Sequence, residues 1–301
     1  MVRTGLLYSA AAFLLASSTQ ALSLESVTNW GGSNPSNLKL DIYVPKNKAA
    51  SPALILALHP CGGSGPSYAQ YQADYTQMAE QKGFVVAYPT ATNDSNCWDV
   101  SSPMALKHEG GGDPTTLNNM VKYLTQKYNV DKTKIFATGS SSGCMMTNVM
   151  LAIYPDVFAA GSCYSGVAAG CLVGSPGNSP TSSDRTCANG KVNKSGPEWA
   201  KLVKSFYPGY SGSYPRMMTF HGTADNLVFP ANLDEQLKEW SALLNVGFTM
   251  NATNQPSQGY TKMVYGDGSK LMGFLAQNVG HTVPVHKELD LQWFGITEGR
   301  V

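Results

Sequence analysis

Residues 134–150 read "KIFATGSSSGCMMTNVM" and contain the pattern G-x-S-x-G, with Gly139, Ser141 and Gly143 at its fixed positions. A short apolar run precedes the pattern and apolar residues at helical spacing follow it, which predicts a strand, a tight turn and a helix. In such a turn, side chains larger than glycine at the flanking positions would clash, and the middle serine is lifted above the sheet. The stretch therefore predicts Ser141 as a nucleophile, although the bare string "GSSSG" could also be a flexible serine-rich turn.

Short apolar runs alternate with helical patterns on both sides of this stretch. The predicted elements are strands at residues 53–59, 84–89, 134–139, 159–166, 216–222 and 260–266 and helices at residues 75–83, 115–128 and 144–155. Strands separated by helices of this length predict a doubly wound, mostly parallel α/β sheet with right-handed crossovers, in a single domain. Residues 166–200, rich in Gly, Ser, Pro and Asn, interrupt this alternation of strands and helices. They predict a long loop above the sheet, here termed the excursion.

Composition excludes some classes of partner. The chain has 301 residues, of which 43% are hydrophobic and 14% charged, and its net charge is +1. It can bury a sizeable core, but it offers no basic footprint for nucleic acid and no polybasic patch for a membrane surface. We expect a monomer that acts on a neutral partner, such as a carbohydrate or a neutral ester.

The N-terminus has the pattern of a secretory leader. Arg3 precedes a short apolar run, and small residues stand at Thr19 and Ala21, so we predict a signal peptide over residues 1–21 and a catalytic domain over residues 22–301. The predicted location is therefore secreted and extracellular. The candidates for N-glycosylation in a eukaryotic cell are the sequons at Asn93, Asn193 and Asn251.

All six cysteines follow the predicted leader, and an even number in an exported chain favours disulfides. Two of them lie within the excursion, and two follow neighbouring predicted strands whose carboxyl ends meet at one edge of the sheet. The predicted bridges are Cys61–Cys97 and Cys171–Cys187, while Cys144 and Cys163 form a third bridge or remain buried thiols. No Cys-x-x-Cys or His-x-x-x-His spacing occurs, so we expect no metal, and nothing in the sequence implies a cofactor.

A serine hydroxyl needs a base to remove its proton. Asp225 follows the strand 216–222 in "HGTADN", and His281 follows a late apolar run in "NVGHTVPVH". In this order of residues, Asp225 would hold the His281 ring in the correct tautomer, and His281 would take the proton from Ser141.

Four other residues compete for these roles. His286 lies in a stretch that resembles an exposed helix start, and His221 sits at a strand end, where it is better placed to support the turn that aims Asp225. Asp234 lies in a polar helical run and is expected to be solvated. Asp267 follows a strand in "YGDGS" and is the serious alternative to Asp225.

Ester hydrolysis also needs donors for a tetrahedral oxyanion. The predicted donors are the backbone N–H of Ser142 and that of Cys61, in the glycine-rich loop 59–65, which could otherwise be an ordinary turn. Trp98 is a candidate for an acyl or sugar pocket, with a place in the core as the alternative. His108, in "KHEGGGDP", could lie at the substrate rim or simply at the surface. We expect the excursion 166–200 and the loop 93–113 to shape this pocket.

Several of these motifs together resemble one family. "HPCGGSG" (59–65), "NCWDVSS" (96–102), "HEGGG" (108–112), "TGSSSGCMMTNVM" (138–150), "HGTADN" (221–226) and "NVGHTVPVH" (278–286) are similar to motifs of the secreted fungal esterases of carbohydrate esterase family 1. That family includes feruloyl and acetylxylan esterases and is related to polyhydroxybutyrate depolymerases. The resemblance implies an α/β-hydrolase fold and a serine triad at Ser141, Asp225 and His281.

The resemblance also implies a substrate, the xylan of plant cell walls. "HPCGG" and "YTKMVYGDGSK" (260–270) look more like the feruloyl esterase branch, so ferulate esters of arabinoxylan are the first expectation and acetyl groups on xylose the second. A non-catalytic carbohydrate-binding protein on the same fold is the alternative from a different class.

Overall fold

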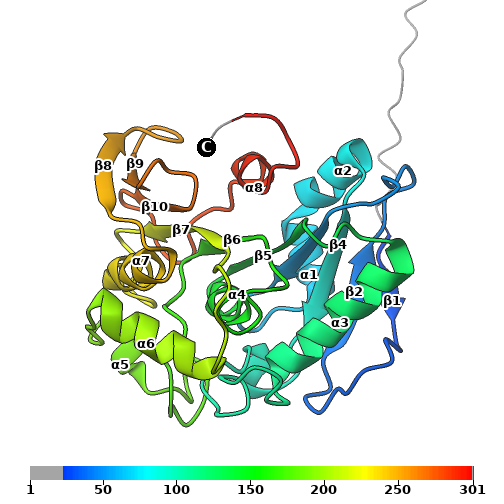
Figure 1. The fold of residues 1–301 in the computed structure, drawn as a ribbon, viewed down its shortest axis with the longest axis horizontal. Helices are drawn as coiled ribbons and strands as arrows, with labels where there is room; N and C mark the ends of the chain where they lie inside the picture. Colours follow the sequence, from blue (N-terminus) through cyan, green and yellow to red (C-terminus); the bar gives the residue numbers. More distant parts are fainter. Residues whose placement is uncertain (1–22, 300) are drawn as a thin grey trace, which may run out of the picture.

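The computed structural model describes residues 23–299 and residue 301, and its central feature is a sheet that runs through the whole molecule (Figure 1). The strands of the described residues are β1 (Glu25–Val27), β2 (Lys39–Tyr43), β3 (Leu54–Leu58), β4 (Val85–Thr90), β5 (Ile135–Ser140), β6 (Ala160–Tyr164), β7 (Arg216–Gly222), β8 (Phe248–Thr253), β9 (Tyr260–Tyr265) and β10 (Leu271–Ala276). Their order is β1-β2-β4-β3-β5-β6-β7-β10-β9-β8. The run from β4 to β10 is parallel, and the outer strands on both sides pair antiparallel.

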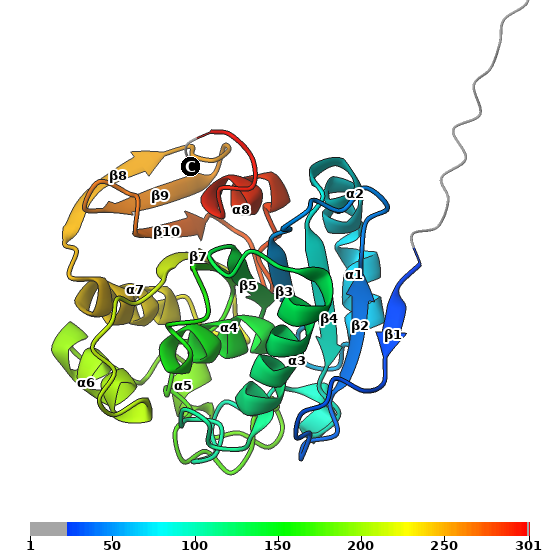
Figure 2. The ribbon, with the colours of Figure 1, turned by 45° about the vertical axis from the view of Figure 1, so that its right-hand side comes forward.

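Helices cover both faces of the sheet, as Figures 1 and 2 show. One face carries α3 (Asp113–Tyr128), α4 (Ser142–Ile153), α6 (Gly196–Phe206) and α7 (Ala231–Leu244), and the other carries α1 (Gly65–Tyr71), α2 (Ala73–Lys82) and α8 (Lys287–Trp293). A 3-10 turn, η1 (Asp94–Asn96), and the short helix α5 (Arg185–Ala188) lie in loops. The strands β3 to β6 are buried along their whole length because both of their faces are covered, which explains their continuous apolar sequences.

The doubly wound, mostly parallel sheet predicted from the sequence is confirmed, and its layers are those of an α/β-hydrolase. One part of the prediction needs correction, because β9 is antiparallel to both of its neighbours. The strands β1, β2 and β8 were not predicted; the edge strand β8 is exposed at nearly every position and therefore lacks a buried-face pattern. The predicted leader, residues 1–21, lies outside the described residues. Within the described part of the chain, no helix has the length and apolar character needed to span a membrane.

The parallel strands end at one edge of the sheet, and the predicted site residues follow these ends. Ser141 comes directly after β5, Asp225 follows β7, and His281 follows β10. Since the carboxyl ends of parallel strands meet at a common edge, residues far apart in the sequence come together there.

A buried carboxyl group ties α8 to the sheet. The side chain of Asp290 is fully buried and accepts hydrogen bonds from the Ser162 and Tyr164 hydroxyls at 2.5 and 2.6 Å and from the Tyr75 hydroxyl. The Tyr164 oxygen also accepts the backbone N–H of His286 at 3.1 Å. These bonds fix α8 and the end of the loop that carries His281.

This carboxyl group predicts a pH dependence of stability. Burial raises the pKa of Asp290 from 3.8 to about 6, although its hydrogen bonds act in the opposite direction. Between about pH 4 and pH 6, Asp290 keeps its proton in the folded state but has lost it in the unfolded state. The free energy of unfolding therefore falls as the pH rises through that window. We expect the free energy of unfolding of the parent to fall between pH 4 and pH 7, relative to Asp290→Asn, by on the order of 3 kcal/mol. Urea denaturation at both pH values measures this, and a pH-independent difference between the two proteins would contradict it.

Candidate active site

Ser141 occupies a sharp turn between β5 and α4. Its backbone angles are φ 55° and ψ −119°, a strained conformation for a non-glycine residue. A Cβ atom on Gly139 would lie 2.4 Å from the backbone of Gly143, and one on Gly143 would lie 2.0 Å from the Leu58 carbonyl oxygen. The Ser141 N–H donates to the Tyr164 carbonyl at 2.8 Å. The two glycines are therefore required by close backbone approaches, and the turn holds the serine at the helix N-terminus.

The structure brings Ser141, His281 and Asp225 into one hydrogen-bonded chain. His281 Nε2 lies 2.8 Å from Ser141 Oγ, and His281 Nδ1 lies 2.7 Å from Asp225 Oδ2. Ser141 and Asp225 are buried, with 7% and 3% of their surface exposed. In this geometry the imidazole can take the serine proton on Nε2 while its Nδ1–H donates to the carboxylate.

The surroundings of Asp225 keep its side chain ionised. Its Oδ1 accepts the N–H groups of Leu227 and Val228 at 3.0 and 2.9 Å, and its Oδ2 also lies 3.4 Å from His221 Nε2. Burial alone would raise the pKa of this carboxyl group, but the hydrogen bonds from His221, His281 and Val228 outweigh it and hold the pKa well below its ordinary value. A permanent negative charge at this position favours the imidazolium that forms when His281 accepts a proton.

The four competing residues lie elsewhere. His221 is buried, and its Nε2 donates to the Val228 carbonyl at 2.8 Å, so it supports the turn that carries Asp225. His286 is half-buried at the start of α8, with its ring against Phe220 and Tyr260, rather than at an exposed helix start. The carboxylates of Asp267 and Asp234 make no contact with His281: Asp267 binds Ser269 in a turn, and Asp234 is exposed on α7.

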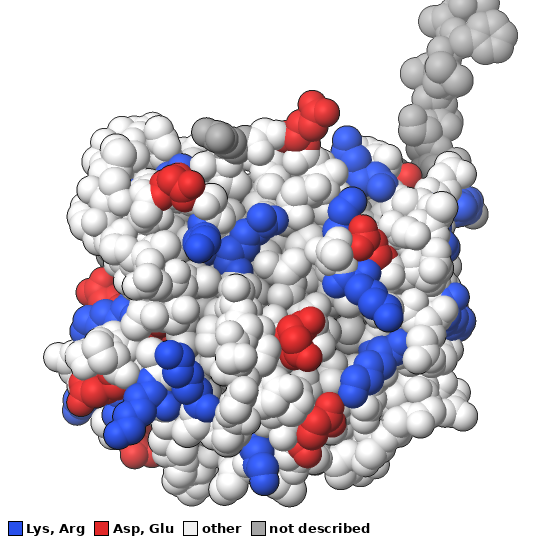
Figure 3. Space-filling view, viewed as in Figure 1, with Lys and Arg blue, Asp and Glu red and all other residues white. Residues whose placement is uncertain are grey.

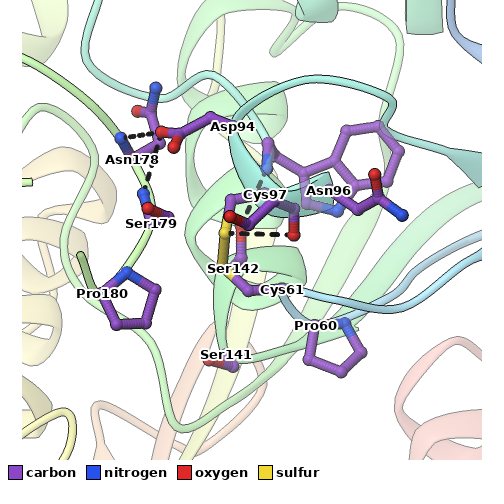
Figure 4. Close-up of a disulfide and its surroundings, with 12 residues drawn as sticks. Pro60, Cys61, Asp94, Asn96, Cys97, Ser141, Ser142, Asn178, Ser179 and Pro180 are labelled. Carbon is purple, nitrogen blue, oxygen red and sulfur yellow. Dashed lines mark hydrogen bonds between the residues drawn. A yellow bond between two sulfur atoms is a disulfide. The ribbon is translucent and has the colours of Figure 1, made fainter. Parts of the chain in front are cut away.

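Both predicted oxyanion donors lie beside Ser141. Figure 4 shows Cys61, Ser141 and Ser142 close together. The Ser142 N–H is at the first position of α4, where no intrahelical acceptor exists, and the Cys61 N–H has no hydrogen-bond acceptor within the described residues. Each is therefore free to donate to a negatively charged substrate oxygen, where the α4 N-terminus adds a favourable dipole.

A narrow cavity opens at Ser141. Its volume is about 30 Å³. The remaining lining residues come from α4, from the excursion and from the loop after β7: Met145, Val167, Leu172, Asn178, Pro180, Ser183, Arg185, Ala188, Leu227 and Val228, together with Cys61. Larger cavities of about 310 and 550 Å³ include Arg216, the first residue of β7, and so lie at the opposite edge of the sheet.

The two residues proposed for the pocket need correction, because neither lines this cavity. Trp98 is fully buried, and its indole N–H donates to the His59 carbonyl at 2.9 Å. The His108 Nδ1–H donates to the Ile153 carbonyl, at the carboxyl end of α4, at 2.6 Å, and the His108 ring stacks on Tyr207. Since α4 has 12 residues and is about 18 Å long, His108 is a helix length away from Ser141.

Seven of the lining residues lie within the excursion 166–200, as the sequence predicts, but the individual side chains of the wall were not predicted. Apolar side chains such as Leu172 and Val228 form the wall, and a single cation, Arg185, is among the lining residues within the described chain. The Arg185 guanidinium donates to the Leu227 carbonyl at 3.0 Å and so joins the excursion to the loop that carries Asp225. The glycine- and serine-rich composition of residues 166–200 signals only a loop, whereas its Cys171–Cys187 pair indicates that the loop is held in place.

Three disulfides occur in the structure: Cys61–Cys97, Cys144–Cys163 and Cys171–Cys187. The pairing of Cys144 with Cys163 joins α4 to β6 and decides between the two possibilities that the sequence leaves open. The sequon residues Asn93, Asn193 and Asn251 are all exposed, so each is accessible for modification. Among the described residues, no three His, Cys, Asp or Glu side chains are placed to hold a metal ion.

The face of the molecule that Figure 3 shows is mostly uncharged, and basic and acidic side chains occur on it in small groups. The chain as a whole has 21 basic and 20 acidic residues. Such a surface suits a neutral ligand better than a polyanion.

Comparison with known proteins finds similar chains among esterases. Residues 70–252, more than half of the chain, match the prolyl oligopeptidase family. Feruloyl esterase B of Talaromyces stipitatus is 47% identical over 279 residues, which cover 93% of this chain and 77% of that protein. A probable acetylxylan esterase A of Aspergillus clavatus is 44% identical over 307 residues, covering 98% and 97%. The solved structure of an acetyl xylan esterase from Aspergillus awamori is 42% identical and has a TM-score of 0.84, covering 91% of this chain and 100% of that one.

Proposed function

Because the chain belongs to the prolyl oligopeptidase family and groups with the fungal feruloyl and acetylxylan esterases, we propose that it is a secreted esterase that removes acyl groups from plant cell-wall xylan. The observation that carries this proposal is the contact of His281 Nε2 with Ser141 Oγ at 2.8 Å, at the floor of a cavity. The three disulfides are in keeping with an exported protein.

The proposed reaction has two steps, which share one base. In the first, His281 takes the Ser141 proton, Oγ bonds to the acyl carbon, and the sugar oxygen leaves with the proton from His281. In the second, water attacks the acyl-enzyme, His281 takes the water proton and returns it to Ser141, and the carboxylic acid leaves. The Cys61 and Ser142 N–H groups stabilise the oxyanion in both steps. This complete arrangement argues against the alternative of a non-catalytic binding protein.

The acyl group that we propose first is ferulate, on the evidence of the relatives named feruloyl esterase B. Acetate is the second candidate, and one observation favours it: the cavity at Ser141 is narrow, at about 30 Å³, and an acetyl group needs less room than a feruloyl ring. Binding of the larger ring would be helped by an outward movement of the wall formed by the excursion and by the loop 227–228. The two candidates therefore differ in how far this wall opens when a substrate binds.

Hydrolysis of two substrates distinguishes the candidates. We expect the purified protein to release ferulic acid from methyl ferulate, measured by chromatography, and to release less acetate per enzyme from acetylated xylan. Ser141→Ala protein serves as the control for contaminating esterases. Release of acetate with no release of ferulate would overturn the first candidate in favour of acetate, and release of neither would count against the esterase function itself.

A further inference from the structure

The carboxylate of Asp94 joins the loop after β4 to the excursion (Figure 4). Asp94 Oδ2 accepts the backbone N–H groups of Asn178 and Ser179, at 2.5 and 3.0 Å. Both Asp94 oxygens also lie 2.8 Å from the Ser182 hydroxyl. Asn178 and Pro180 line the cavity at Ser141, so Asp94 helps to hold residues 178–182, here termed the wall segment, in place. Asn178 Oδ1 also accepts the Val100 N–H of the same loop, at 3.0 Å.

The three residues that follow Asp94 hold the loop 61–63, here termed the oxyanion loop because it carries the Cys61 N–H. Each of the three makes a separate connection to it. The connections are Ser95 O with the Gly62 N–H (2.8 Å), Asn96 Nδ2 with Gly63 O (3.1 Å) and the disulfide Cys97–Cys61. Immediately afterwards, the Trp98 N–H donates to Ser142 Oγ at 2.9 Å. The segment 94–98 thus has the wall segment at one end and both oxyanion donors at the other.

The backbone of this segment is strained. Asp94, Ser95 and Asn96 have φ values of 45°, 60° and 55°, and each non-glycine residue in this region costs about 1 kcal/mol. Such a run persists only when contacts at its ends outweigh the strain. Loss of the contacts at Asp94 would let the turn relax, and the oxyanion loop, which is bonded to every residue of the turn after Asp94, would move with it.

The contacts at Asp94 are of the strong, charge-assisted kind. Burial alone would raise the pKa of this carboxyl group, but the hydrogen bonds from Asn178, Ser182 and Ser179 outweigh burial and hold the pKa below its ordinary value. The side chain is therefore ionised at neutral pH. Hydrogen bonds to a charged acceptor are roughly twice as strong as those between neutral groups.

We propose that Asp94 is a positioning residue that couples the wall segment to the oxyanion loop, so that contacts made 84 to 88 residues away in the sequence set the position of the Cys61 N–H. This inference rests on the esterase function proposed above. It predicts that loosening the wall segment slows the chemistry even on an acyl group too small to need a wide pocket.

Asp94→Asn tests the coupling with little change in shape. The amide keeps one acceptor oxygen but turns an NH2 group toward the backbone N–H donors. With 4-nitrophenyl acetate, we expect kcat per active site to fall about tenfold and KM to stay within twofold. Phenylboronic acid forms a tetrahedral adduct with an active serine, and its inhibition constant should rise by the same factor as kcat falls. Active sites are counted by fluorophosphonate titration, so that a misfolded fraction does not enter kcat.

Two further variants keep the test decisive. Ser182→Ala removes one hydrogen-bond donor to the Asp94 carboxylate and should lower kcat two- to threefold. If Asp94→Asn yields no protein with titratable active sites, the Ser182 variant tests the coupling in its place. Asp99→Asn is the matched control, because Asp99 is a carboxylate of the same loop whose hydrogen bonds, among the described residues, come from Ser101 and Ser102 and not from the wall segment. Its kcat should stay within twofold of the parent.

Parent-like kcat in the Asp94 variant, or an equal loss in the Asp99 variant, would overturn the coupling. An unchanged boronic acid constant beside a lowered kcat would also overturn it, because the oxyanion donors would then be in place. Failure of the parent itself to hydrolyse the ester would instead refute the proposed function.

Discussion

Replacing Ser141 by alanine is expected to reduce ester hydrolysis by about a million-fold, because the loss of one member of such a triad removes the whole covalent pathway. The fold should survive the change. Ser141 makes one side-chain hydrogen bond, to His281, and such bonds contribute about 1 kcal/mol to stability. The melting temperature should therefore shift by only about 2–4 °C. Turnover of 4-nitrophenyl acetate and a thermal melt on the same sample measure both quantities.

The neighbouring serine provides the control for this prediction. Ser140 is equally buried, but its hydroxyl is hydrogen-bonded to the Tyr68 hydroxyl at 3.0 Å rather than to His281. Ser140→Ala should keep at least a tenth of the parent activity and should still react with a fluorophosphonate. Activity that survives in the Ser141 variant, or labelling that persists there, would show that the nucleophile is another residue.

Replacing Asp225 by asparagine is expected to lower kcat by about ten-thousand-fold with little change in KM. The amide can still accept the N–H groups of Leu227 and Val228 on its oxygen, so the turn should keep its shape. Its NH2 group then faces His281 Nδ1 and stabilises the tautomer that carries a proton on Nε2. That tautomer cannot accept the proton of Ser141, so the base is lost although the geometry remains.

Asp267→Asn is the matched control for the acid. Asp267 is the alternative that the sequence leaves open, and in the structure it is exposed and bonded to Ser269. Its variant should retain parent kinetics within twofold. A loss of activity in the Asp267 variant, or an Asp225 variant with kcat within tenfold of the parent, would reverse the assignment.

The Ser141 turn could be predicted from a few adjacent residues because its constraints are local. Gly139 and Gly143 are required by backbone approaches of 2.4 and 2.0 Å, and the flanking strand and helix have clear apolar patterns. Asp225 and His281 could be predicted because each follows an apolar strand, and parallel strands bring their carboxyl ends to one edge. Their distances from Ser141 and from each other, in contrast, are properties of the folded chain.

The pocket residues could not be predicted in this way. Trp98 and His108 stand in loops beside predicted site residues, yet packing turns Trp98 into the core and places His108 at the far end of α4. The actual wall comes from the excursion, whose sequence has no periodic pattern. Neighbourhood along the chain is thus a poor guide to which loop side chains meet in space.

The sequence by itself determined the layers of the fold, the serine turn and the order in which the candidate acid and base follow it. These features depend on steric rules and on hydrophobic periodicity, both of which act within a few residues. Only the tertiary structure decided the disulfide between Cys144 and Cys163, the width of the cavity and the hydrogen bonds between Asp94 and the wall segment. Those features depend on how closely distant loops approach one another, and that approach is set by the packing of the whole chain rather than by any stretch of it.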